Sequence, residues 1–450
     1  MNRNRIIQLL AIAVAVGAIA VGRPVASRVA DQRQDLKLGL AAGTLENVPW
    51  HLTIANAALG SFRGLAADLL WHRAHYLKQA GQYYEANQLS EWITTLQPQF
   101  PQVWAFHAWN MAYNISVATY TPEERWSWVS KGINLLREKG VKYNPNGVRI
   151  YRELGWIFFH KIGRMSDDMH WHYKKEMARE WGELLGAPKV GASAEETIER
   201  FRTVAEAPDS LEALVEAEPG VVKWIKQIQS IPEADYELNS RLLRQIGGLR
   251  MVAGADDLAI TGLDVQKMAS RLGYDSRLLP VARPETESGR RQVEALLAFL
   301  RKQVLKREYN MDARRMLENM EEFGPFDWRH PAAHAFYWGY LGTEKAVDAR
   351  AQENIDALNT YRQNIHCIQM MTGYGRIGYD RVSGYIDLMP DPRFFPYYDK
   401  WMVKAQEEVQ AGNFRSTTVD SFEHGHENFL HRAVTYTYLY GDKESAAETY

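Results

Sequence analysis

The chain has 450 residues, of which 46% are apolar and 24% are charged. This composition is that of an ordinary globular protein and excludes a disordered, collagen-like or multi-span membrane chain. The 53 lysine and arginine residues nearly balance the 55 acidic residues, so no basic surface predicts nucleic acid as a partner. Cys367 is the only cysteine, which excludes an intrachain disulfide and a cysteine-built zinc site.

The N-terminal segment has the pattern of a membrane anchor. Arg3 and Arg5 precede a run from Ile6 to Val21 that contains no charged residue. The length of this run lies between the apolar region of a cleaved signal peptide and the roughly 20 residues that span a bilayer. We therefore expect residues 1–29 to form an uncleaved transmembrane anchor. A cleaved signal peptide and a buried core helix are the alternatives.

The arginines around this run indicate its orientation. Arg3 and Arg5 keep the amino terminus inside under the positive-inside rule and export the rest of the chain, although Arg23 and Arg28 on the other flank oppose this. Charges interrupt every later apolar stretch, so no second span is expected. We expect a linker over residues 30–50 and a periplasmic or extracellular body that meets the membrane only through the N-terminal helix.

Residues 51–186 show a helical-hairpin spacing. Leu70 and Trp104 are 34 residues apart, and the segment from Tyr151 to Phe158 has the pattern Tyr-x2-Leu-Gly-x2-Phe. Helices cross closely only where one side chain is small, so Ala74, Ala108 and Gly155 are the expected contact points. The spacing from Trp104 to Tyr151 exceeds 34, and we expect the extra residues between Ile115 and Thr121.

These residues resemble the tetratricopeptide-repeat family over roughly Leu70 to Leu185. The pattern around Gly155 is similar to the W-x2-L-G-x2-Y pattern of that family, with one aromatic residue replacing another at each end. The segments 59–71 and 324–329 also resemble membrane-anchored bacterial proteins of this repeat type. The resemblance implies an all-α fold built as a helical-hairpin array, or α-solenoid, and it brings no enzymatic activity with it.

The amino-acid composition of the chain changes after Gly186. We expect residues 187–325 to form an inserted helical subdomain, in which a capping box begins a helix at Ser193, and prolines separate short helices. Gly289 and Gly324 bracket one expected long helix. Residues 326–450 are expected to form a second repeat-like region. Its last helix has no stop signal before Tyr450, so we expect either a fragment or an array that continues.

One glycine-rich segment fits a nucleotide-binding pattern without its context. Gly373 to Gly378 reads G-x-G-x-x-G, but a dinucleotide site needs a strand before this pattern and a helix after it. A helical pattern precedes the segment here. We interpret it as an ordinary glycine-rich loop and expect no cofactor.

The histidines do not have the spacing of a metal site. His330 and His334 lack the intervening glutamate of a zinc protease, and His426 and His431 are one residue too far apart to share a helix face. We therefore expect no metal ligands. Cys367 lies in an apolar context and is expected to pack as a small apolar residue.

The resemblance implies that fixed positions of each first helix line a concave groove. Aromatic side chains there offer rigid contact area, and cations would hold a peptide carboxylate or acidic segment. The alternative is that the tryptophans pack against neighbouring helices, as aromatic residues at helical spacing more often do. The candidate groove residues are Trp71, His75, Lys78, Trp109, Tyr113, Arg149, Arg152, Trp156 and His160.

We therefore predict a membrane-anchored, exported scaffold that binds a protein or peptide partner and is not an enzyme. A rival hypothesis is an envelope hydrolase or glycan-acting protein, for which Glu153 and Asp168 would be the candidate acid and base. A third hypothesis is a structural subunit of a membrane complex. This third hypothesis implies the same fold as the scaffold and differs from it in that the protein has one permanent partner.

Overall fold

The computed structural model describes residues 28, 62–254, 264–345, 355–410, 419–439, 441 and 443–449. Apart from residue 28, the expected anchor and linker lie outside the described residues, as does Tyr450. The described part of the chain is mostly helical and contains one two-stranded sheet, which confirms the all-α fold class. No described helix is both long and apolar enough to cross a membrane.

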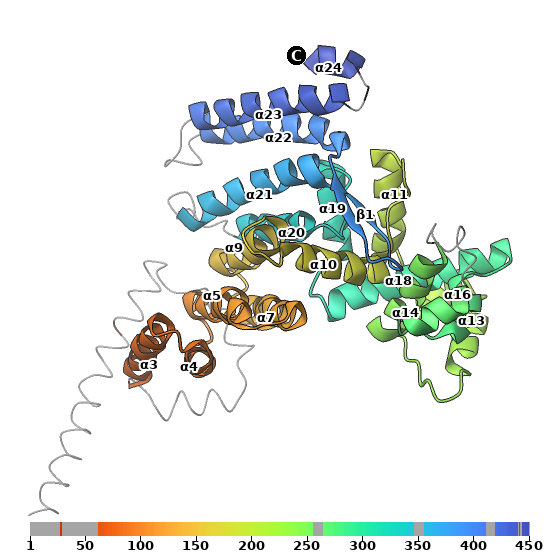
Figure 1. The fold of residues 1–450 in the computed structure, drawn as a ribbon, viewed down its shortest axis with the longest axis horizontal. Helices are drawn as coiled ribbons and strands as arrows, with labels where there is room; N and C mark the ends of the chain where they lie inside the picture. Colours follow the sequence, from red (N-terminus) through yellow and green to blue (C-terminus); the bar gives the residue numbers. More distant parts are fainter. Residues whose placement is uncertain are drawn as a thin grey trace, which may run out of the picture.

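The first helices pair into hairpins that stack in layers (Figure 1). The first hairpin consists of α3 (Phe62–Gln79) and α4 (Tyr83–Leu96). The elements that follow it are α5 (Pro101–Trp109), η2 (Asn110–Ile115), α6 (Ser116–Ala118), α7 (Pro122–Asn134), η3 (Leu135–Gly140), α8 (Val141–Tyr143), α9 (Val148–Trp156), η4 (Ile157–Gly163) and α10 (His170–Leu185). The segments η2, η3 and η4 are π-helical and continue the α-helices before them.

The extra residues of the second hairpin lie in its helices. We expected them between Ile115 and Thr121, but the helix continues to Ala118 and the next one begins at Pro122. That prediction is wrong, because the second helix of this hairpin runs from Pro122 to Tyr143 and is longer than α4, the second helix of the first hairpin. The Thr121 hydroxyl accepts a hydrogen bond from the Glu124 backbone N–H at 3.1 Å and forms a capping box at the start of α7.

Two of the helices are anchored by the same contact. The Trp104 indole N–H donates to the Pro98 carbonyl at 2.7 Å, and the Tyr151 hydroxyl donates to the Pro145 carbonyl at 2.7 Å. In each case the aromatic residue is on the first helix of a layer, and the proline precedes that helix by a few residues. The shared contact makes this part of the chain helical-repeat-like.

Mostly short helices follow α10, as the prolines predicted, and α18 is the long exception. They are α11 (Ala194–Ala205), α12 (Leu211–Ala217), α13 (Val221–Gln229), α14 (Ser240–Ala253), α16 (Val265–Arg271), η5 (Ser276–Leu278), α17 (Leu279–Ala282), α18 (Glu287–Arg307) and α19 (Ala313–Phe323). The capping box at Ser193 is confirmed. The prediction of one long helix between Gly289 and Gly324 is wrong. Asn310 has a positive φ of 49° and the Asp312 side chain caps a new helix.

The last part of the chain returns to the stack of hairpins (Figure 1). Its elements are α20 (Pro331–Lys345), α21 (Ile355–Tyr374), β1 (Arg376–Tyr379), β2 (Ile386–Met389), η7 (Pro392–Phe394), α22 (Phe395–Gln410), α23 (Val419–Leu439) and α24 (Lys443–Thr449). Strands β1 and β2 pair antiparallel, with Gly378 opposite Asp387. The glycine-rich segment is therefore a helix end followed by a strand, which corrects the expected loop, and the helix that a dinucleotide site needs does not follow it.

Close helix contacts occur at the three predicted small residues. Ala74 and Ala108 are fully buried, and a Cβ added at Gly132 of α7 would lie 2.9 Å from the Ala108 carbonyl oxygen. Gly155 of α9 is also enclosed. A Cβ there would lie 2.3 Å from the Gln363 side-chain nitrogen of α21 and 2.9 Å from a backbone oxygen of α20.

Helix α9 thus meets α20 and α21 through glycines, although α10 to α19 lie between α9 and α20 in the sequence. A Cβ at Gly342 of α20 would lie 2.6 Å from the Tyr151 Cβ of α9, and one at Gly339 would lie 2.2 Å from the Asn364 amide oxygen of α21. One continuous hydrophobic core extends from Trp104 to Ala433 around this junction. The first hairpin has a smaller core of its own.

We expect Gly155→Ala to lower the free energy of unfolding by about 1–3 kcal/mol, because the new methyl group must displace the backbone of α20. Chemical denaturation monitored by circular dichroism measures this. The matched control is Gly64→Ala in α3, where no described atom lies within 4 Å of an added Cβ. Alanine favours a helix by up to about 1 kcal/mol over glycine. Equal stabilities of the two variants would contradict the close contact at Gly155.

Candidate functional site

A series of side-chain contacts crosses the first layers of the stack on one face. The Trp71 ring of α3 lies 4.9 Å from the Phe106 ring of α5, measured between centroids. The Lys78 ammonium lies 4.0 Å from the centroid of the Trp109 ring, which stacks on Tyr113 at 5.3 Å. We call this series, from Trp71 to Trp156, the aromatic face.

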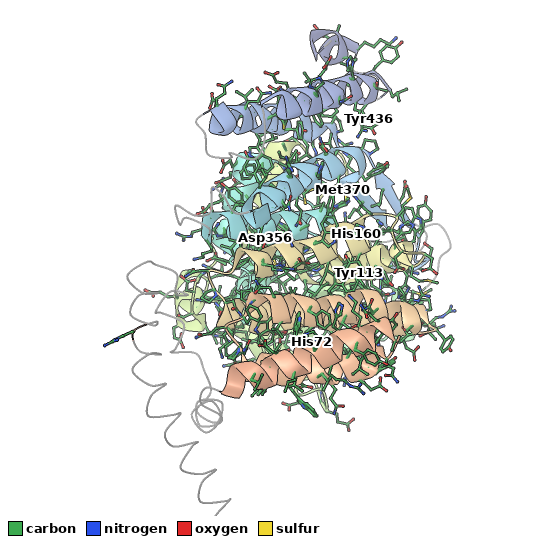
Figure 2. The ribbon with its side chains drawn as sticks, turned by 90° about the vertical axis from the view of Figure 1, so that its left-hand side faces the viewer. His72, Tyr113, His160, Asp356, Met370 and Tyr436 are labelled. Carbon is green, nitrogen blue, oxygen red and sulfur yellow. The ribbon has the colours of Figure 1, made fainter. Side chains whose placement is uncertain are left out.

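The aromatic face continues into the next layer. The Tyr113 ring lies 5.9 Å from the His160 ring, and the Tyr113 oxygen lies 3.4 Å from the His160 Nδ1 atom. The His160 ring stacks on Trp156 at 4.8 Å. Figure 2 shows Tyr113 and His160 on neighbouring layers, with α21 in the layer above them. The contacts therefore run from α3 through η2 to η4.

The local helix geometry explains why these side chains share a face. Trp109 ends α5 and Trp156 ends α9, and a π-helical segment begins directly after each. Residues four positions apart lie on one face of an α-helix, and the wider π turn also keeps them close in direction. Tyr113 and His160 occupy these positions.

A cavity of about 440 Å3 lies at the far end of the aromatic face. Helix α9 and segment η4 form one wall, and α21 forms the other. Its lining carries three arginines and one glutamate, together with aromatic and amide side chains. The lining residues are Arg152, Glu153, Trp156, Phe159, Arg164, Asn359, Arg362, Gln363 and His366.

Most of the predicted groove residues lie on the aromatic face or at its cavity, and His75 and Arg149 do not. Trp156 and Arg152 line the same cavity, but Arg152 is paired with Glu153 at 2.6 Å and with Asp356 at 2.9 Å. His75 is exposed and lies within hydrogen-bond distance of Gln79 on its own helix. The Arg149 Nε atom is buried, and no described residue bonds to it. The other candidates are half-buried, as expected for a lining that both packs and remains accessible.

Burial and neighbouring charges set the protonation of the aromatic face. Burial lowers the pKa of His160, and the nearby Arg164 and Lys161 lower it further. His160 is therefore neutral at neutral pH and can accept a hydrogen bond. Burial also lowers the pKa of Lys78, whose ammonium group lies over the Trp109 ring. Beneath the face, Lys161 forms an ion pair with Asp167, and both side chains are buried.

Sequence reasoning missed the α21 side of the cavity. Asn359, Arg362, Gln363 and His366 follow the spacing of one helix face and form a polar stripe, which is the signal that was available. The expected groove was confined to the first repeats, whereas α21 reaches it only after the intervening helices. Phe106 was also missed, although it lies between Trp71 and Lys78 in the contact series.

The candidate residues for other chemistry are held in separate contacts. Glu153 pairs with Arg152, and the exposed Asp168 pairs with Arg125 at 2.6 Å. Among the described residues, no three histidine, cysteine or acidic side chains gather where they could hold a metal ion. His426 lies 2.7 Å from the Asp399 carboxylate. Cys367 is fully buried, as predicted.

Comparison with protein-family models, with curated proteins and with solved structures gave no match for this chain.

Two buried histidines have a structural role at the start of α20. The His330 Nδ1 atom accepts a hydrogen bond from the Ala332 backbone N–H at 3.1 Å, and thus caps the helix. The His334 ring lies 4.1 Å from the Trp181 ring. Burial lowers the pKa of each histidine to about 3. Both side chains are therefore neutral in the folded protein well below the pH at which an exposed histidine becomes charged.

In the unfolded chain these histidines bind protons at a pKa of about 6.5, whereas in the folded protein they stay neutral. The free energy of unfolding therefore falls as the pH drops through about 6.5. Each histidine contributes a loss of about 2 kcal/mol between roughly pH 7 and pH 5, by the same linkage. We expect His330→Asn, which keeps an acceptor at the cap, to reduce this pH slope in denaturation curves. His72→Asn on exposed α3 is the matched control. A slope in His330→Asn equal to that of the wild type would contradict the assignment.

Proposed function

We propose that the protein is a membrane-anchored, exported scaffold of the tetratricopeptide-repeat type, with its hairpins arranged as an α-solenoid. In this proposal it acts by binding a protein partner and catalyses no reaction. The 34-residue spacing of Leu70 and Trp104 and the pattern around Gly155 support the repeat type. The charge-free run from Ile6 to Val21 supports the anchor.

The observation that carries the binding proposal is the aromatic face and the cavity at its end. Trp71, Trp109, Tyr113 and Trp156 are all half-buried, so each is held by packing and yet has accessible surface. Rigid aromatic side chains that keep accessible surface are typical anchors in protein interfaces. A purely structural role would place these rings in the core, where Trp338 and Tyr151 lie.

The charges of the face indicate the kind of segment that it binds. Lys78 lies over the aromatic rings, and Arg164 lines the cavity with its guanidinium 4.7 Å from the Phe159 ring. Arg164 has no ion pair with any described residue. We therefore propose an extended peptide segment in which apolar residues contact the tryptophans, and an acidic residue or carboxylate reaches the cavity.

We expect Trp156→Ala together with Arg164→Gln to weaken binding of selected acidic peptides by about tenfold or more, since an interface anchor contributes about 2 kcal/mol. Peptides selected by display against the full chain, and titrated by fluorescence anisotropy, provide the measurement. The matched control is Trp92→Ala combined with Arg73→Gln. Both control residues are exposed, on α4 and α3. Equal affinity of both double variants would exclude the aromatic face as the binding surface.

The anchor is tested independently of the face. We expect the full chain to stay in the membrane fraction after an alkaline carbonate wash and to be cleaved by protease added from outside. Val14→Arg places a charge in the middle of the apolar run, which costs about 3 kcal/mol of insertion free energy and should release the protein. Release of the wild type at a mature mass lacking the run would instead identify a cleaved signal peptide.

A further inference from the structure

Two cavities away from the aromatic face meet at a cluster of arginines. The first has a volume of about 630 Å3 and lies among α11, α12, α18 and the segment before α20. The second has a volume of about 760 Å3 and lies between α14 and the hairpin of β1 and β2. Figure 1 shows β1 reaching from the hairpin stack toward α14 and α18. Both cavities share Gly186 and the four residues Arg200, Arg250, Arg301 and Arg329, which we call the arginine cluster.

Each arginine uses part of its hydrogen-bonding capacity to hold the backbone. Arg200 donates to the Leu185 carbonyl at 2.8 Å, and Arg301 donates to the Leu184 carbonyl at 3.1 Å. Arg250 donates to the carbonyl of Ala282, which ends α17, and Arg329 donates to a carbonyl of β1. A guanidinium has five N–H donors, so these bonds leave most donors available for other partners.

The carboxylates around the cluster are fewer than the arginines. Glu294 pairs with Arg250 at 2.6 Å and lies 3.7 Å from Arg301. Asp327 forms a two-point ion pair with Arg329. Arg200 has no carboxylate within 4 Å among the described residues, although its guanidinium lines both cavities.

The other charges of the two cavities have partners elsewhere. Glu218 of the first cavity pairs with Arg291 at 3.0 Å. In the second cavity, Arg381 lies over the Tyr274 ring, and the Asp380 carboxylate accepts hydrogen bonds from its own turn. The cluster therefore retains excess positive charge. Burial lowers the pKa of Arg301 to about 10, and Arg200 and Arg250 add to this lowering.

Away from its charged side chains, the lining of the first cavity is mostly apolar. Its apolar lining residues include Phe201, Val204, Leu214, Ala298, Phe326 and Trp328. Its volume falls in the range of about 300–1,000 Å3 that small-molecule sites occupy. The cavity is open to solvent near the cluster, because Arg200 and Glu294 are both exposed residues.

We propose that this site binds an anionic amphiphile, with a carboxylate or phosphate head at the arginine cluster and a single apolar chain in the first cavity. Guanidinium groups match both head groups through paired hydrogen bonds. The apolar lining favours an alkyl chain over water. If Arg200 served only to hold helices together, it would not need to line two cavities without a carboxylate partner. This proposal does not depend on the aromatic face.

The test uses the purified full chain in amphipol and isothermal titration calorimetry, with each probe below its micellar concentration. The probes are dodecanoate, dodecyl phosphate, dodecanol and inorganic phosphate. We expect both anionic amphiphiles to bind, and we expect dodecanol and inorganic phosphate to bind at least about tenfold more weakly, since one charged contact contributes roughly that factor. The preference between carboxylate and phosphate distinguishes a fatty acid from a phospholipid as the source.

Two variants locate the binding. Arg200→Gln removes the unpaired cation, and we expect it to weaken binding of dodecyl phosphate about tenfold. The matched control is Arg290→Gln, since Arg290 is an exposed arginine of α18 that does not line either cavity. Binding of amphiphiles to the N-terminal apolar run is the same in both variants and cancels in the comparison. Thr203→Phe, at an exposed position of the first cavity, should weaken dodecyl phosphate but not inorganic phosphate.

Three results would overturn the proposal. Equal affinity for dodecanol and dodecanoate would show an apolar site without head-group recognition. Equal affinity for inorganic phosphate and dodecyl phosphate would show an anion site without a chain pocket. Equal binding by Arg200→Gln and Arg290→Gln would place the amphiphile outside the arginine cluster. None of these outcomes bears on peptide binding by the aromatic face, so the two proposals fail separately.

Discussion

The close contact of α9, α20 and α21 is the constraint on which the rest of the structure depends. Gly155, Gly339 and Gly342 have no side chain, and each leaves space that the neighbouring helix fills. Helices at this distance exchange dispersion contacts along their length, which no bulkier residue would allow. The contact joins the first part of the chain to its last part. It also sets the wall spacing of the cavity between α9 and α21, which the ion pair of Arg152 and Asp356 then bridges.

The helices between α10 and α20 share the hydrophobic core of this junction, and arginines also attach them to it. Arg301 and Arg200 bond to the carbonyls that end α10, and Arg329 bonds to β1. A helix end leaves carbonyls without partners, so guanidinium donors at that place satisfy the backbone and fix the position of α11 and α18. The same geometry gathers positive charge at one point. The same arginines therefore attach the helices and form the proposed anion site. Attachment alone does not require more cations than carboxylates, so the excess of cations supports the anion site.

The parts of the fold that depend on sequence neighbours could be predicted. The caps at Thr121 and Ser193 and the small residue at Ala108 act within one turn or one hairpin, so local patterns indicate them. The break at Asn310, the pairing of β1 with β2 and the π-helical segments were not predicted. Helical periodicity continues through Asn310, the glycine-rich segment was interpreted as a loop, and α-helical patterns do not distinguish a π turn. For the site, the tryptophans were predictable from the repeat register. The wall from α21 was not, since it reaches the site only through the glycine contact with Gly155.

The two repeat-like helices also give the aromatic face a direction. Each has a tether to a preceding proline and a small residue at its closest contact, and these features are sufficient for packing. Each also keeps Trp109 or Trp156 half-buried on the same side, with Tyr113 or His160 four residues later. Packing alone does not explain this second pair. Three arginines and one glutamate line the cavity beside Trp156, whereas Lys78 of α3 is the cation over the Trp109 ring. The face therefore carries more cations at its α21 end than at its α3 end. A partner segment bound along it would thus place its acidic residue at the α21 end, which fixes the orientation of the chain that the proposal requires.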